Sequence, residues 1–319
     1  MLDSYAFSRY TVPIIIPDRK ETASMELRVL QYFLAVTREQ SISGAAESLH
    51  LSQPTLSRQL KELEEELGKQ LFIRGNRRIS LTEEGMILRK RAEEVMDLIH
   101  KTRQEISVTD HGVSGDVFIG AGETDGMRLL ARAARKLQES YPDIRYHIAS
   151  GDTTDVLENL DKGLIDFGLL FSAVDTSKYD SIRFPVKDAY GILMRKDSPL
   201  AGKDFLTPED LLDKPLIFNR NTKDGDLLMS WLNRSLSEIH TAATYNLLFN
   251  ASLMVEEGLG YAFALDKIIH VTENSSLLFK PLCPAIHAEM NLIWKKYQFF
   301  SKAAHKFLEE ITSVVTGQS

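Results

Sequence analysis

Cysteine and long apolar runs are scarce in this sequence. Cys283 is the single cysteine among 319 residues, so no intramolecular disulfide can form, and this usage is typical of a reducing cytoplasm. No stretch approaches the roughly 20 apolar residues that span a bilayer. The longest N-terminal apolar patch, Val12 to Ile16, is interrupted by Pro13 and lacks the cleavage pattern of a secretory signal. We therefore expect a cytoplasmic protein that makes no membrane contact.

An excess of positive charge is also missing. The net charge is −7, and its distribution along the chain is uneven. Residues 1–24 carry three basic and three acidic side chains, residues 25–107 carry thirteen of each, and residues 108–319 carry 22 and 29. Bulk charge therefore gives no support to nucleic-acid binding, and any such interpretation must depend on where individual side chains are placed.

Patterns that mark catalytic, metal or cofactor sites are absent from the sequence. The eight histidines form no His-x-x-x-His pair, and neither Cys-x-x-Cys nor Gly-x-Ser-x-Gly occurs. Gly120 to Gly126 has the spacing G-x-G-x-x-x-G, which differs from the dinucleotide fingerprint. We expect neither a metal nor a cofactor, and an enzyme is the alternative that this sequence favours less.

The most informative stretch is Leu49 to Leu67. Its leucines Leu56, Leu60, Leu63 and Leu67 are spaced by four, three and four residues, which places all of them on one stripe of a helix. The opposite face begins with short groups, followed by an arginine and then by further charged residues: Pro54, Ser57, Arg58, Lys61 and Glu65. A polar face of this kind can meet base edges and phosphates.

Two further helices are predicted just before this stretch. An amphipathic helix runs from Met25 to about Arg38, and Gly44 to Leu49 forms a short second helix, with Ser41 or Ser43 as its N-cap. Ser52 caps the third helix, where Pro54 is tolerated in the first turn. The spacing indicates a helix-turn-helix. From periodicity alone, an ordinary αα-hairpin remains an alternative.

A short hairpin follows the third helix. Gly68 ends that helix, Leu71 to Ile73 and Ile79 to Leu81 are short apolar strands, and the turn between them carries Arg74, Arg77 and Arg78. Three arginines on a solvated turn can contact phosphates or a minor groove. This hairpin therefore reads as the wing of a DNA-binding domain, with a plain solvated hairpin as the alternative.

A long helix is expected from Thr82, which serves as its N-cap. Apolar or small residues recur at intervals of four and three, in the manner of a coiled-coil seam: Leu88, Ala92, Val95, Ile99, Thr102 and Ile106. We predict that it joins two copies into a homodimer or homotetramer, which would present paired recognition helices to successive half-sites. A helix buried against its own domain is the alternative.

The acidic remainder predicts an α/β effector domain. Strands at Val117–Ala121, Ile144–Ala149 and Ile165–Phe171 alternate with helices at Met127–Ser140 and Asp155–Lys162. A second set has strands at Ala189–Met194, Leu216–Phe218 and Tyr261–Leu265, and helices near Pro208–Leu212, Gly225–Leu236 and Ala251–Glu257. Two such lobes with strands passing between them resemble periplasmic binding proteins, in which the ligand lies in the cleft at the strand ends.

Polar and aromatic residues at or near these strand ends are the candidate ligand-binding groups. Phe171 and Ser172 lie at the end of the third strand, and Asn219 and Arg220 follow a strand of the second lobe. Asn246 and Phe263 are further candidates in the second lobe. Arg220 is the one cation of this set, and its alternative role is that of a surface loop arginine.

The run from Ala45 to Gly85, AAESLHLSQPTLSRQLKELEEELGKQLFIRGNRRISLTEEG, resembles the winged helix-turn-helix of LysR-type bacterial transcriptional regulators. The C-terminal segments YPDI, LDKGLIDFGLL, EDLLDKPLI and EEGLGYAFAL carry the same resemblance more weakly. It implies a double-stranded DNA operator, a small-molecule effector and RNA polymerase as partners. The residues it places on DNA are Ser52, Gln53, Pro54, Thr55, Ser57 and Arg58, with Arg74, Arg77 and Arg78 on the wing.

The same resemblance implies that Gly122, Glu123 and Thr124 line the effector cleft. Members of the family often carry a serine at the position of Gly122, where it helps to hold an anionic effector. Because this chain has Gly122 with Glu123 and Asp125 beside it, a simple carboxylate effector is not favoured.

The expected organisation is α/β overall, with an all-α winged helix-turn-helix at the N-terminus. Residues 1–24 form a leader that is disordered or an alternative start, residues 25–82 the DNA-binding domain, 83–108 the dimerisation helix and 109–115 a hinge. Residues 116–319 form the effector domain, with lobe I at about 116–187 and 277–319 and lobe II at about 188–276.

Overall fold

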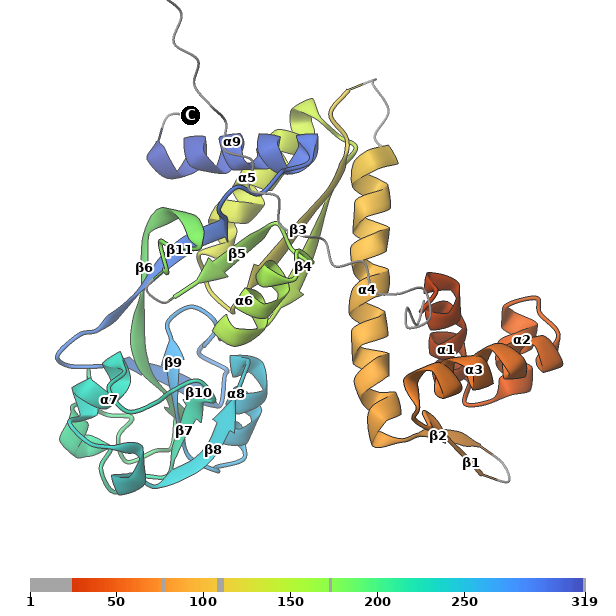
Figure 1. The fold of residues 1–319 in the computed structure, drawn as a ribbon. Helices are drawn as coiled ribbons and strands as arrows, with labels where there is room; N and C mark the ends of the chain where they lie inside the picture. The colour runs from red at the N-terminus through yellow and green to blue at the C-terminus, as the bar shows by residue number, and fades with distance from the viewer. Residues whose placement is uncertain (1–24, 76–77, 108–111, 172–173, 318–319) are drawn as a thin grey trace, which may run out of the picture. The chain divides into compact units, whose positions relative to one another are not determined.

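The computed structural model describes residues 25–75, 78–107, 112–171 and 174–317. The chain divides into an N-terminal unit that ends at Ile99 and a C-terminal unit that begins at His100, and Figure 1 shows the elements of each. The predicted leader, residues 1–24, lies outside the described residues.

The N-terminal unit, which we call the head, contains three short helices and a hairpin before a long helix. Its elements are α1 (Leu27–Glu39), α2 (Ile42–Ser48), α3 (Gln53–Leu67), β1 (Phe72–Arg74), β2 (Ile79–Leu81) and α4 (Glu83–Ser107), whose last turns belong to the C-terminal unit. Local caps define these helices: Ser41 accepts from the Gly44 N–H, and Gly68 ends α3 with φ 62°. The predicted winged helix-turn-helix is confirmed.

The core of the head contains three of the four leucines predicted on the α3 stripe. Leu56, Leu60 and Leu63 are buried, together with Phe33 of α1. Leu67 is 36% exposed because it lies in the last turn of α3, beyond the reach of the core. The predicted stripe therefore ends one turn earlier than its spacing indicates.

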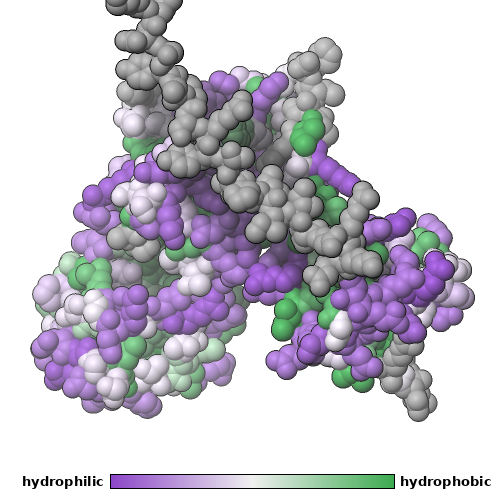
Figure 2. All heavy atoms as spheres, in the orientation of Figure 1, coloured by the Kyte–Doolittle hydropathy of each residue, from purple (hydrophilic) through white to green (hydrophobic). Residues whose placement is uncertain are grey.

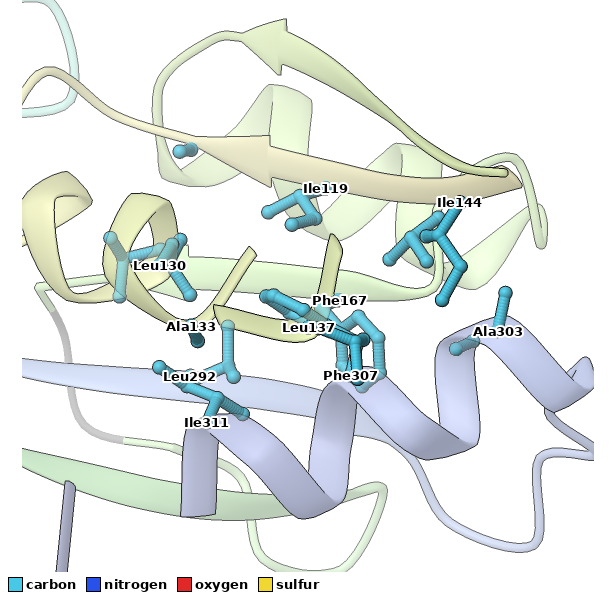
Figure 3. Packing of buried hydrophobic residues seen from close by; sticks show 14 of the residues in the cluster. Ile119, Leu130, Ala133, Leu137, Ile144, Phe167, Leu292, Ala303, Phe307 and Ile311 are labelled. Atoms are coloured by element: carbon cyan, nitrogen blue, oxygen red, sulfur yellow. The ribbon is translucent and has the colours of Figure 1, made fainter. Parts of the chain in front are cut away.

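The C-terminal unit begins with lobe I, whose βαβαβ order agrees with the sequence pattern. Its elements are β3 (Gly115–Ala121), α5 (Met127–Ser140), β4 (Ile144–Ser150), α6 (Thr153–Asp161), β5 (Phe167–Leu170), β11 (His287–Lys295) and α9 (Lys302–Thr316). β3 is parallel to β4 and β5. Figure 3 shows α5 and α9 contributing Leu130, Leu137, Phe307 and Ile311 to one core beneath this sheet.

Lobe II is built on a strand that it shares with lobe I. β6 (Tyr179–Arg195) pairs with β11 through its first half and with β9 (Tyr261–Leu265) and β10 (Leu277–Pro281) through its second. The other elements are two 3-10 turns (Pro208–Asp210 and Leu236–Glu238), β7 (Leu216–Asn219), α7 (Leu227–Leu232), β8 (Thr241–Tyr245) and α8 (Leu248–Glu256). Figure 1 shows β6 running from one lobe into the other.

Three predicted boundaries in lobe II need correction. β10 pairs with residues 191–195 of β6, so lobe II extends past residue 276 to the turn before β11. The helix predicted near Pro208–Leu212 is a single 3-10 turn. The helix predicted for Gly225–Leu236 is limited to Leu227–Leu232, because Gly225 and Asn233 both adopt positive φ.

Figure 2 shows a mostly hydrophilic surface on the visible face of this lobe.

Candidate functional sites

The N-terminal turn of α3 presents a polar surface to solvent. Ser52 caps the helix, its Oγ accepting from the Thr55 N–H at 3.2 Å. The buried leucines fix how the helix is turned, and most of the residues predicted to face DNA are therefore exposed: Ser52, Gln53, Pro54, Thr55 and Arg58, with Ser57 half-buried. This surface joins hydroxyl and amide groups to one guanidinium, which are groups that bind base edges and phosphates.

The cations of α3 are held only by weak contacts. Arg58 is 71% exposed, and its Nε lies 3.6 Å from the Glu62 carboxylate. Lys61 pairs with Glu65 at 3.3 Å, again over one helical turn. Exposed pairs of this spacing contribute only about 0.3–0.5 kcal/mol, so both cations can exchange their carboxylates for phosphates at little cost.

The Glu64 side chain of α3 forms hydrogen bonds to the backbone at the start of the wing. The Glu64 carboxylate accepts from the backbone N–H groups of Leu71 at 2.7 Å and Phe72 at 3.2 Å. Arg78 is exposed at the turn of the wing. Arg77 and the side chain of Arg74 lie outside the described residues, so the predicted arginine cluster is represented here by Arg78.

The predicted seam on α4 needs a partial correction. Ala92 is only 1% exposed and belongs to the core of the head, and Leu88 packs against that core. Ala92 therefore has no surface left for a second helix. Further along α4, Val95 is 38% exposed, Ile106 is 79% exposed and Ile99 is half-buried. An apolar stripe starting at Val95 remains for contact with another chain.

A cavity of about 920 Å³ separates the two lobes of the C-terminal unit. Six of the predicted effector residues line it: Gly122, Glu123, Phe171, Asn219, Asn246 and Phe263. Ser172 lies outside the described residues. Thr124 and Arg220 are not among the residues that line the cavity, and each is bonded to other groups of the protein.

Thr124 belongs to the junction between the lobes. Its hydroxyl donates to the Asp188 carboxylate on β6 at 2.7 Å and accepts from the Gly126 N–H at 2.9 Å. Asp188 is fully buried. Burial raises the pKa of the Asp188 carboxyl, and the charge of Asp266 adds to this, while the bond from Thr124 acts in the opposite direction. Thr124 therefore stabilises the strand that crosses between the lobes.

Arg220 forms a salt bridge across the cavity. Its guanidinium follows β7 in lobe II and contacts the carboxylates of Asp152 and Asp155, at the start of α6 in lobe I. Asp152 is also the N-cap of α6. Burial acts to raise the pKa of Asp152, but the hydrogen bonds from Arg220 and from the backbone outweigh it and lower that pKa. The charged bridge holds the lobes together.

A second contact between the lobes is made by Glu123. Its carboxylate accepts from the backbone N–H of Leu248, the first residue of α8. The N-terminus of a helix has unpaired N–H groups and a partial positive charge that favour an anion. A side chain of lobe I occupies this position in lobe II.

Arg220→Gln is expected to destabilise the protein in a pH-dependent way. A carboxyl whose pKa is depressed on folding stabilises the protein above its unfolded pKa of about 3.9, and this stabilisation is lost as the pH falls through the folded value. Because Arg220 is partly exposed, we expect a small lowering of the urea midpoint at pH 7 that shrinks below pH 4. Urea denaturation across this pH range would measure it.

The matched control for this variant is Arg234→Gln, an exposed arginine of lobe II that donates to the Asn233 carbonyl oxygen. Its charge is the last of the causes that lower the pKa of Glu238, so this variant should change stability far less than Arg220→Gln at every pH. A loss in Arg220→Gln that does not change between pH 7 and pH 3 would contradict the salt-bridge account.

Several cavity residues were missed by the sequence interpretation. They include two tyrosines and residues of β11 and the α7 loop: Tyr190, Tyr245, Lys223, Asp226, His287, Glu289 and Asn291. Tyr245 ends β8, next to the predicted Asn246. The rule that ligands lie at strand ends would have found it if β8 had been recognised.

Two other kinds of feature are a metal site and a membrane-spanning helix. Across the described ranges, no group of three or more His, Cys, Asp or Glu side chains could hold a metal ion. Within the same ranges, no helix is both long enough and apolar enough to cross a membrane.

A winged helix-turn-helix followed by a two-lobed α/β domain with an interlobe cavity defines a DNA-binding regulator that senses a ligand. Two family models match this chain. "Bacterial regulatory helix-turn-helix protein, lysR family" matches residues 27–86, and "LysR substrate binding domain" matches residues 110–316. The chain belongs to the LysR family of DNA-binding transcriptional regulators, which carry an effector-binding domain.

Similar proteins share this arrangement over nearly their full length. The HTH-type transcriptional regulator BsdA of Bacillus subtilis (strain 168) is 26% identical over 304 residues, covering 89% of this chain and 99% of the relative. The probable RuBisCO transcriptional regulator of Phaeodactylum tricornutum is 28% identical over 308 residues, covering 90% and 97%. The crystal structure of CbnR, a LysR family regulator, has a TM-score of 0.69 at 18% identity, covering 91% and 99%, and supports the fold.

Proposed function

We propose that this regulator reads a double-stranded operator with the first turns of α3, Ser52 to Arg58, and contacts the flanking phosphates with the wing. The observation that carries the proposal is the orientation of α3. Leu56, Leu60 and Leu63 are buried, which leaves the polar face and Arg58 in solvent. A DNA complex has been crystallised for full-length CbnR, which has the same fold.

Sequence readout matters more than charge in this proposal. From Ser52 to Thr82 the chain carries six basic and four acidic side chains, which is too small an excess for strong non-specific binding. Discrimination therefore depends on hydrogen bonds from Gln53, Thr55, Ser57 and Arg58 to base edges.

The DNA-binding proposal is tested by selection from random duplexes. The full-length protein is incubated with a pool of random DNA, and bound molecules are recovered and sequenced at physiological salt. A homodimer should enrich a dyad-symmetric motif whose half-sites are about one helical turn, or a multiple of it, apart. A recovered pool with the same sequence distribution as the input would contradict the proposal.

We further propose that the protein is a homodimer or homotetramer located in the cytoplasm. We also propose that it acts by binding DNA and effector rather than by catalysing a reaction, and that it works with RNA polymerase. The apolar stripe of α4, with Val95 and Ile106 exposed and Ile99 half-buried, supports self-association. An effector in the interlobe cavity would change operator binding by favouring one arrangement of the lobes.

Val95→Asp should reduce the assembly to smaller species. A carboxylate placed in an apolar helix–helix contact loses its hydration without gaining a partner. Sedimentation velocity of the full-length protein measures the change, with His100→Asp as the control, since His100 is exposed on another side of α4. An unchanged sedimentation coefficient for Val95→Asp would contradict the proposal that this stripe of α4 joins two copies of the chain.

A further inference from the structure

Two groups at the interlobe cavity that could hold an anion, the Arg220 guanidinium and the first N–H of α8, are already bound by the protein's own carboxylates. Arg220 contacts Asp152, and its NH2 nitrogen lies 2.9 Å from both oxygens of Asp155. The first N–H of α8 is occupied by Glu123. An anionic ligand would have to displace these carboxylates and would leave them in the cavity beside it, which is unfavourable.

The wall of the cavity is acidic. Glu123, Asp152, Asp226 and Glu289 line it, against one lysine, Lys223. Salt-bridge groups outside the wall change this excess. Arg220, Arg183 and Lys187 add three positive charges, and Asp155, which also pairs with Arg220, adds one negative charge. With the partners included there are five acidic and four basic groups, so the wall keeps an excess of one negative charge.

Two tyrosines line the same cavity as these carboxylates. Tyr190 and Tyr245 both line the cavity, as do Phe171 and Phe263. Burial and then the charge of Asp226 raise the pKa of Tyr190, and burial, Tyr190 and Glu123 raise the pKa of Tyr245. Glu123, Asp226 and the two tyrosines all line the same cavity, and the directions of these pKa shifts agree with that placement.

This combination matches one chemical class of ligand. A cation over an aromatic face is attracted by the negative face of the ring, and a carboxylate nearby adds charge complementarity. The Tyr245 hydroxyl donates to the Phe263 carbonyl oxygen at 2.7 Å, which turns the polar tip of the side chain away from a ligand. Leu169, Leu228 and Ile268 supply apolar surface in the same cavity.

We propose that the effector is a small organic cation, a primary or quaternary amine with an apolar body, bound between Glu123, Asp226 and the rings of Tyr190 and Tyr245. The proposal depends on the cavity being the effector site. The ammonium group draws Glu123 away from the Leu248 N–H, so binding loosens one contact between the lobes, while the Arg220 bridge remains.

The proposed ligand class, small organic cations, is tested with ligands of matched shape and opposite charge. Melting temperatures of the full-length protein are measured with 2-phenylethylamine against 3-phenylpropionate, tyramine against 3-(4-hydroxyphenyl)propionate, and benzyltrimethylammonium against phenylacetate. At least one amine should raise the melting temperature by about 2–5 °C while its acid partner does not. A larger shift with the acids, or no shift with any amine, would overturn the proposal.

Variants locate the binding site of an active amine. Asp226→Asn and Glu123→Gln should each weaken its affinity about tenfold or more by calorimetry, and Glu273→Gln, an exposed glutamate outside the cavity wall, should not. Unchanged affinity in both cavity variants would overturn the site. DNA selection by the unliganded protein is a separate measurement, so a failed amine screen with intact DNA binding rejects the effector class and leaves the DNA-binding proposal standing.

Discussion

Lys101→Met is expected to lower the free energy of unfolding of the C-terminal unit by about 3–5 kcal/mol. Lys101 and Asp166 form a buried ion pair at 2.7 Å, with only 7% and 4% of the two side chains exposed. The ammonium group also donates to the Gly163 carbonyl oxygen at 3.0 Å and lies 5.3 Å from the centre of the Phe118 ring. Methionine fills similar space but leaves the Asp166 carboxylate charged and without its cation.

Urea denaturation of the full-length protein measures this loss, and a double variant separates charge from packing. Asp166→Asn added to Lys101→Met removes the orphaned charge and should recover a large part of the stability, since the Phe118 N–H can still donate to the side-chain oxygen. Lys187→Met, at a lysine that is 55% exposed, is the matched control and should have little effect. A loss below about 1 kcal/mol in Lys101→Met would contradict the account.

Arg58→Ala is expected to weaken operator binding by about 1–3 kcal/mol, or roughly fivefold to 150-fold. Arg58 lies one turn into α3 on the polar face, and it is 71% exposed with only a long contact to Glu62. The planar guanidinium group of Arg58 can donate two hydrogen bonds to guanine or to a phosphate, and alanine cannot replace these bonds. Since the side chain is outside the core, the fold and the oligomer should not change.

Fluorescence anisotropy with a selected duplex at fixed salt concentration measures this effect. Lys61→Ala is the matched control, because it removes the same charge one turn further along α3, where Lys61 pairs with Glu65 at 3.3 Å. We expect a smaller loss there, of the size of a single phosphate contact. Equal affinities for Arg58→Ala and the wild type would remove Arg58 from the interface.

The head could be predicted from the sequence because its signals are local. The caps and the leucine spacing of α3 involve residues close in sequence. The structure has the predicted caps at Ser52 and Gly68, and of the two predicted candidates, Ser41 and Ser43, it has Ser41 as the cap of α2. The exception is α4, where Leu88 and Ala92 continue the period of the seam but pack into the head. Periodicity identifies an apolar face and does not say which partner covers it.

The C-terminal unit was less predictable, because its pairing is distant in sequence. β6 has 17 residues, whereas the hydrophobic pattern indicated only Ala189–Met194. Its first half is stabilised by pairing with β11, more than a hundred residues later. β8 and β10 were not predicted either, since both are short and partly exposed.

The candidate effector site was also only partly predictable, because it too depends on residues distant in sequence. The strand-end rule selected Phe171 and Asn219, and Asn246 and Phe263 were named as further candidates; all four line the cavity. It could not show that Arg220 pairs with Asp152, or that Thr124 donates to Asp188, because those partners lie 68 and 64 residues away. Which polar groups remain free for a ligand is decided by tertiary structure.

Genome-wide mapping of bound DNA in cells, with wild type and Arg58→Ala compared at equal protein levels, tests the central claim most directly. We predict a limited set of discrete bound sites upstream of genes, each carrying the dyad-symmetric motif found by selection, and loss of these sites in Arg58→Ala. Binding spread evenly over the genome, or discrete sites that persist in Arg58→Ala, would contradict the claim that α3 reads the operator.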